Sequence, residues 1–105
     1  MNVSVFLEPA HEGWTAVDHR EDYWKKISGS GSIKRKQVKR TEQNGMALLE
    51  FFIPEFESVP VRQKSINAFL VRDGLWIDVH LSKDQFEKED QELFEQVVAS
   101  IRFED

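Results

Sequence analysis

The stretch NGMALLEFFI, residues 44–53, decides the fold that we expect for this chain. Asn44 and Gly45 lie between two strand-like runs, and this dipeptide is the strongest short-range signal of a β-hairpin because both residues accept positive φ. The strand that follows is apolar on both faces and is interrupted only by Glu50. A strand of this kind needs cover on both sides. We therefore expect it near the centre of a sheet that carries a helix on each face.

A second hairpin is predicted for residues 61–81, VRQKSINAFLVRDGLWIDVHL, with Asp73 and Gly74 as its turn. Pro54 is expected to end the first hairpin, and residues 54–60 are expected to connect the two. The faces of the last strand differ in chemistry, because successive side chains point to opposite sides. One face carries Leu75, Ile77, Val79 and Leu81, and the other carries Trp76, Asp78 and His80.

Two further strands are expected before the first turn. Residues 2–8 alternate, with Val3, Val5 and Leu7 on one face, and Pro9 stops this strand. Residues 33–43, IKRKQVKRTEQ, form a polar strand that leads into the turn.

Helical patterns occupy two segments. Residues 15–27 predict the first helix, with Asp18 and Glu21 as a capping box. The second helix is predicted from Asp90 onward, with Phe86 as an anchor in the preceding loop. Its apolar residues recur at helical spacing: Leu93, Phe94, Val97, Val98 and Ile101. The order β-α-β-β-β-β-α predicts an α+β fold, an antiparallel sheet with helices on both faces.

The composition limits the classes of protein that fit. A length of 105 residues predicts a single domain, residues 1–105. The chain has no cysteine, which excludes disulfides, thiolate nucleophiles and cysteine-based metal sites. No run approaches the roughly 20 apolar residues of a membrane span. Residues 1–10 lack the pattern of a signal peptide, so the expected location is the cytoplasm for the sequence as written, and outside it if a signal was removed.

Basic residues are concentrated in one segment of this acidic chain, whose net charge is −5. They are Lys25, Lys26, Lys34, Arg35, Lys36, Lys39 and Arg40. One interpretation is a phosphate-bearing partner, with nucleic acid bound by Lys34, Lys36, Lys39 and Arg40. The segment lacks interleaved aromatic residues for base stacking, which counts against nucleic acid. We favour the interpretation that these lysines protect an edge strand from pairing with other chains.

Residues 28–32, SGSGS, alternate serine and glycine. A phosphate loop has a strand before its glycines and a helix after them, whereas here a helix precedes and a strand follows. Alternating glycine and serine is the composition of a flexible spacer. We interpret residues 28–32 as a flexible connector that was introduced by engineering, and not as a nucleotide site.

The candidate chemistry lies on the strand face that bears Trp76, Asp78 and His80. An aspartate and a histidine two residues apart can orient a general base or hold a metal ion. A metal site requires a third ligand, which no sequence neighbour supplies. The other interpretation is solvation of a partly covered sheet face. His11 and His19 are expected at the surface.

Several segments together resemble the PsbP-like family, the group around the extrinsic photosystem II protein. The residues that carry the likeness are VSVFLEP (3–9), AVDHREDYWKKI (16–27), NGMALLEFFIPEF (44–56), NAFLVRDGLWIDVHLSK (67–83) and LFEQVVASIRF (93–103). The wider superfamily includes a nuclear-import factor that binds the Ran GTPase and bacterial DcrB-like envelope proteins. The resemblance implies an α+β sandwich and a binding or scaffolding role, including one in a bacterial envelope.

The chain departs from this family at its N-terminus. Family members have further strands before the first strand seen here, so the resemblance implies a sheet that is short at this end. An open sheet edge follows, and a homodimer that exchanges or pairs strands would close it.

Three functions remain open from the sequence. The first is a non-catalytic module that binds an unknown protein or small ligand through Trp76, Asp78 and His80, with no cofactor. The second is a small hydrolase or metal-dependent enzyme that uses Asp78 and His80. The third is a nucleic-acid-binding domain that uses the basic strand and has a steep salt dependence. We favour the first and expect no enzyme.

Overall fold

A computed structural model describes residues 1–29, 31 and 33–102 of the chain. Its elements follow the predicted order: β1 (Asn2–Pro9), α1 (Ala16–Ser28), β2 (Lys36–Gln43), β3 (Met46–Phe56), β4 (Val59–Arg72), β5 (Leu75–Lys83) and α2 (Asp90–Ser100). The predicted connector, residues 28–32, is described only in part. Ser28 ends α1 and Gly29 is its C-cap, whereas Ser30 and Ser32 lie outside the described residues.

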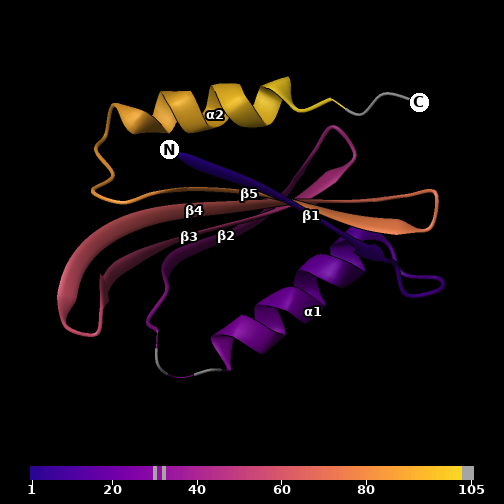
Figure 1. The fold of residues 1–105 in the computed structure, drawn as a ribbon, viewed down its shortest axis with the longest axis horizontal. Helices are drawn as coiled ribbons and strands as arrows, with labels where there is room; N and C mark the ends of the chain where they lie inside the picture. Colours follow the sequence, from indigo (N-terminus) through magenta and orange to yellow (C-terminus); the bar gives the residue numbers. More distant parts are fainter. Residues whose placement is uncertain (30, 32, 103–105) are drawn as a thin grey trace.

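The strands form one antiparallel sheet in the order β1-β5-β4-β3-β2, with α1 on one face and α2 on the other (Figure 1). β4 is the middle strand and β3 lies beside it. Two predicted turns are confirmed. Asn44 and Gly45 have φ of 52° and 78°, and Asp73 and Gly74 have φ of 52° and 76°, as a two-residue hairpin turn requires.

Both faces of β3 are buried, as the sequence predicts. On the α2 side, Phe94 and Val98 of the helix pack with Met46, Leu48, Ile66, Ala68, Ile77, Val79 and Leu81. On the α1 side, the buried residues are Ala47, Leu49, Phe51, Ile53 and Phe69, and Val17, Tyr23, Trp24 and Ile27 of α1 pack against them. Phe86 anchors the loop before α2, with its ring edge-on to Phe94 at 5.6 Å.

Pro54 does not end β3, contrary to the prediction. The ladder between β3 and β4 shifts register between Ile53 and Glu55, and a proline is tolerated at such a bulge because its missing N–H is not needed there. β3 therefore continues to Phe56 and forms a further hairpin with β4. The turn residues Glu57 and Ser58 both have positive φ, 49° and 67°.

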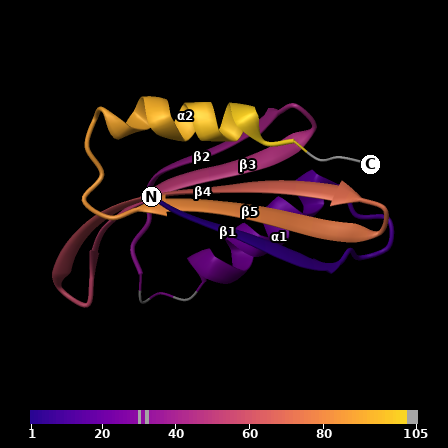
Figure 2. The same ribbon diagram turned by 45° about the horizontal axis from the view of Figure 1, so that its top comes forward.

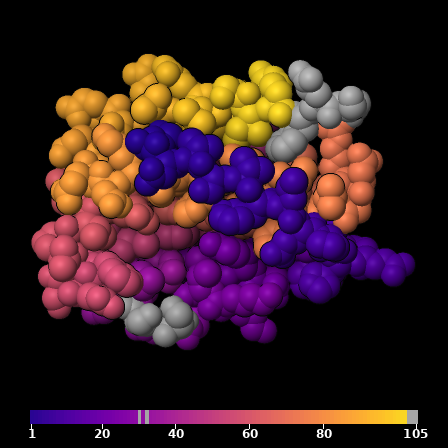
Figure 3. Space-filling model, in the orientation of Figure 1, coloured from indigo at the N-terminus to yellow at the C-terminus, as the bar shows by residue number. Residues whose placement is uncertain are grey.

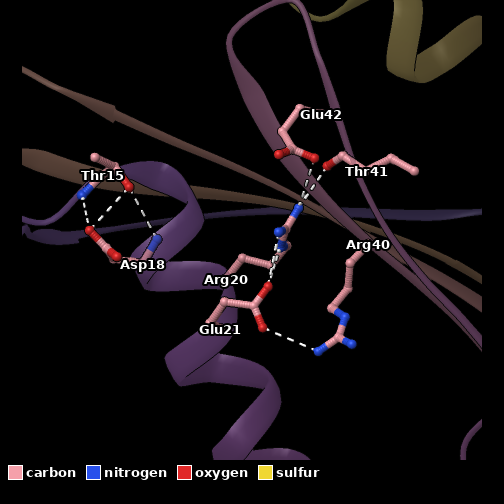
Figure 4. Close-up of polar contacts among 7 residues, drawn as sticks. All are labelled: Thr15, Asp18, Arg20, Glu21, Arg40, Thr41 and Glu42. Carbon is pink, nitrogen blue, oxygen red and sulfur yellow. Dashed lines mark hydrogen bonds and ion pairs between the residues drawn. The ribbon is translucent and has the colours of Figure 1, made fainter.

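The capping box of α1 also differs from the prediction. The N-cap is Thr15, whose hydroxyl accepts the Asp18 N–H at 3.2 Å, while the Asp18 carboxylate accepts the Thr15 N–H at 2.8 Å (Figure 4). Asp18 is thus the third residue of the helix rather than its cap, and Glu21 takes another role.

Glu21 belongs to a polar network that holds α1 against β2 (Figure 4). The buried Arg20 guanidinium donates to the Thr41 carbonyl at 2.8 Å and pairs with Glu21 at 2.9 Å. Glu21 also accepts from Arg40 at 3.2 Å. The network ties α1 to β2, and Tyr23 of the same helix packs against Phe69 of β4.

The opposite edge of the sheet is β1. Figures 2 and 3 show this strand along the rim of the sheet, where none of the described helices and strands covers its outer side. Its apolar side chains are accordingly exposed, from 55% at Phe6 to 61% at Leu7. Within the described residues, no helix has the length and apolar character needed to cross a membrane.

Candidate functional site

A pocket of about 310 Å³ opens on the α1 side of the sheet, where α1, β1 and β5 meet. It is lined by Phe6, Glu8, Tyr23, Trp76, Asp78 and His80. The structure thus brings the three predicted residues together and adds two from β1 and one from α1. Because paired residues on neighbouring strands share a face, the register of Phe6 opposite Asp78 and Glu8 opposite Trp76 builds this wall.

Asp78 lines the pocket and is only 6% exposed. The Asn67 amide donates to its two carboxylate oxygens, at 3.0 and 3.3 Å. Burial raises the pKa of Asp78 to about 6, the Asn67 hydrogen bond opposes this rise, and the negative charge of Glu8 adds to it. Among the described residues, no lysine, arginine or histidine pairs with the Asp78 carboxylate.

His80 lies beside Asp78 but bonds to another residue. Its Nε2 is 2.7 Å from the hydroxyl of Ser65 on β4. Burial lowers the pKa of His80, so the imidazole is neutral at pH 7. In the described part of the chain, no hydrogen bond joins His80 to Asp78.

This arrangement does not suit nucleophilic catalysis. A serine nucleophile needs a base within hydrogen-bond reach and a substrate at its hydroxyl. Ser65 has the base, His80, but is only 1% exposed and lies within the sheet. The carboxylate that would orient the base is bonded to Asn67 instead.

The aromatic wall of the pocket continues into the packing under α1. The Trp76 ring stacks on His19 at 5.0 Å and 15°, and on Phe69 at 6.0 Å and 28°. Tyr23 packs against Phe69 at 5.4 Å. Burial raises the pKa of Tyr23, as does the negative charge of Asp78. Trp76 is thus both a pocket wall and a packing residue.

His19 is buried, and the predicted surface position is wrong. Its ring lies between Trp76 and Trp14, with the Trp14 ring at 5.0 Å. Burial lowers the pKa of His19, and the nearby His11 lowers it further. The physical reason is the cap at Thr15, which starts the helix so that position 19 turns toward the sheet.

The sequence also left open a metal site and a nucleic-acid-binding strand. Within the described ranges, no three His, Asp or Glu side chains gather closely enough to hold a metal ion. The basic residues Lys34, Lys36, Lys39 and Arg40 lie on or before β2, which is an edge strand.

Acidic side chains accompany these basic residues. Lys39 faces Glu50 at 3.8 Å and Arg40 pairs with Glu21. Lys34 and Lys36 share a depression with Glu55 and Glu57. The acids offset the positive potential that a phosphate backbone would require.

Sequence reasoning missed Phe6, Glu8 and Tyr23 because they come from other elements. The partners Ser65 and Asn67 did leave a signal. They are polar residues at alternate positions of a strand face that continues with Phe69. Counting back from the Asp73-Gly74 turn also places Asn67 opposite His80.

Searches of protein-family models and of curated proteins find no match for this chain.

Proposed function

We propose that this chain is a non-catalytic binding module of PsbP-like fold, which holds a small ligand or a side chain of a partner in the pocket under α1. The observation that carries the proposal is the pocket itself. It combines the apolar rings of Phe6, Tyr23 and Trp76 with the polar groups of Asp78 and His80. Mostly apolar pockets with a few convergent polar groups are typical of ligand sites.

The same residues argue for binding rather than catalysis. Asp78 and His80 are each engaged by a buried partner, Asn67 and Ser65. Such partners fix the side chains in place, and the Ser65 hydroxyl that bonds to His80 is itself buried. The resemblance to PsbP-like proteins points the same way.

Three probes of one size test the proposed pocket: benzylamine, benzyl alcohol and benzoate. We expect at least one of them to shift the amide NMR signals of residues 6–8 and 76–80 and the Trp76 indole signal. Phe6→Ala should weaken this binding about tenfold, since Phe6 is a pocket wall that is 55% exposed and so not needed for folding. Phe56→Ala, an exposed aromatic of the β3–β4 hairpin, is the matched control. Absence of pocket shifts with all three probes at millimolar concentration would refute the proposal.

We also infer that two copies of the chain pair through β1. β2, the other edge, carries Lys36, Lys39 and Arg40 and a register shift, which are devices that block edge pairing. β1 has neither a basic residue nor a register shift. Antiparallel pairing about Val5 would place Val3 opposite Leu7 of the second copy, so that exposed apolar side chains meet.

Light scattering on a sizing column tests this pairing. We expect the mass of two chains for the wild type and of one chain for Val5→Lys, because the lysine places two like charges opposite each other at the seam. Val38→Lys, on the protected edge, should leave the mass unchanged. A wild-type mass of one chain at high micromolar concentration would show that β1 does not pair in this way.

A further inference from the structure

We infer that the pocket under α1 takes an organic ammonium group, a positively charged nitrogen that carries alkyl substituents. This inference rests on the proposed binding function and names the chemical class of its ligand. Two features of the pocket carry it: a set of aromatic rings and a pair of carboxylates.

The first feature is the aromatic wall. Phe6, Tyr23 and Trp76 come from three different elements, β1, α1 and β5, and line one pocket. The face of an aromatic ring attracts an ammonium group, and sets of such rings recognise alkylated ammonium ligands. Part of this wall is already fixed, because the Trp76 ring contacts His19 at 5.0 Å and Phe69 at 6.0 Å. The site therefore needs little ordering when a ligand enters.

The second feature is the negative charge. Glu8 and Asp78 line the same pocket, and Asp78 is buried to the level of the core. A buried charge is costly unless it is paired, and the hydrogen-bond partner of Asp78 within residues 1–29, 31 and 33–102 is the neutral amide of Asn67. In the part of the chain that the structure describes, no basic side chain forms an ion pair with either carboxylate. A bound cation would supply the missing charge.

The remaining polar group favours the same class of ligand. His80 is neutral at pH 7 because burial lowers its pKa, and Ser65 occupies its Nε2. The described residues that line the pocket include no lysine or arginine. An anionic ligand would face Glu8 and Asp78 without a compensating charge, so the lining selects against carboxylates and phosphates.

A matched pair of probes tests this inference: choline and 3,3-dimethylbutan-1-ol, in which carbon replaces the charged nitrogen. The two have nearly the same shape and differ in charge. We expect choline to bind at least tenfold more tightly in NMR titrations that follow the Trp76 indole. Asp78→Asn keeps the shape of the pocket but removes one of its two carboxylates, so it should reduce the preference for choline severalfold. Asp84→Asn removes the same charge from an exposed position and should leave the preference intact.

The outcomes separate the two proposals. Tighter binding of choline that is weakened in Asp78→Asn supports the ammonium site, and a preference that Asp78→Asn leaves unchanged overturns the role given to the buried carboxylate. Equal binding of choline and the alcohol overturns the assignment of ligand class but leaves the proposed pocket in place, as does preferential binding of benzoate in the probe series above. No pocket shift with any of these compounds overturns the proposed function together with the inference.

Discussion

Phe94→Ala is expected to lower the free energy of unfolding by about 3–5 kcal/mol, the range for truncation of a fully buried phenylalanine. Phe94 is 0% exposed, and it is one of only two buried residues that α2 contributes among the described residues, the other being Val98. The ring also packs against Phe86, which anchors the loop before the helix. Since α2 has no side-chain hydrogen bond at its N-cap, its docking depends on this packing. The loss is large against a total stability of about 5–15 kcal/mol for a small domain.

Urea denaturation followed by tryptophan fluorescence measures this change. Leu93→Ala is the matched control, because Leu93 is the adjacent residue of the same helix and is 44% exposed. We expect the control to change stability by no more than about 0.5 kcal/mol. Equal losses for the two variants would mean that α2 does not bury Phe94 against the sheet.

The covered faces of β3 were predictable because they follow from local alternation. Its two sets of alternate residues, which include Leu49 on one side and Leu48 on the other, enter the two separate cores. The turns at Asn44-Gly45 and Asp73-Gly74 were predictable for a related reason, since their chemistry is contained in two residues. The local preference and the folded structure agree at both features, so the short sequence window was enough to predict them.

The hairpin that joins β3 to β4 was not predictable from the same rules. Its turn residues, Glu57 and Ser58, have positive φ although neither is glycine or asparagine, and Pro54 lies within the strand before it. Here the pairing of β3 with β4 over a long ladder outweighs local preference. Strain in a short turn is tolerated when the strands on both sides are fixed by their neighbours.

The residues of the pocket also differ in whether a short window of sequence predicts them. Trp76, Asp78 and His80 were found from the sequence because one strand presents them at alternate positions. Phe6 and Tyr23 enter the pocket through the pairing of β1 with β5 and the packing of α1 against the sheet. Neither arrangement has a signature within a short window of sequence. The site is therefore a product of topology as much as of motif.

Asp78→Asn is expected to stabilise the protein at neutral pH by about 3 kcal/mol and to have little effect at pH 4. The folded-state pKa of Asp78 is about 6, above the ordinary value of 3.8, so the folded protein holds its proton more tightly than the unfolded chain. The cost of ionisation is absent below pH 3.8, grows as the pH rises toward 6 and is complete above 6. A difference from 3.8 to about 6 corresponds to about 3 kcal/mol.

The groups that face Asp78 support this sign. The negative charge of Glu8 on β1 raises the cost of ionising Asp78, whereas Tyr23 on α1 and His80 on β5 are neutral at pH 7. The amide of Asn67 on β4 donates to the Asp78 carboxylate and lowers that cost. Asparagine at position 78 still accepts that hydrogen bond without carrying a charge. Urea denaturation at pH 4 and pH 7.5 measures the difference, and Asp84→Asn serves as the exposed control.

A stabilisation that appears only at the higher pH would identify the buried charge as its cause. Destabilisation by Asp78→Asn at pH 7.5 would instead show that the Asn67 hydrogen bonds outweigh burial, and an equal change at both pH values would point to packing. Folding alone gives no reason to keep a carboxylate whose ionisation costs stability. A cation that occupies the pocket offsets that cost, so 50 mM choline should raise the unfolding midpoint of the wild type more than that of Asp78→Asn.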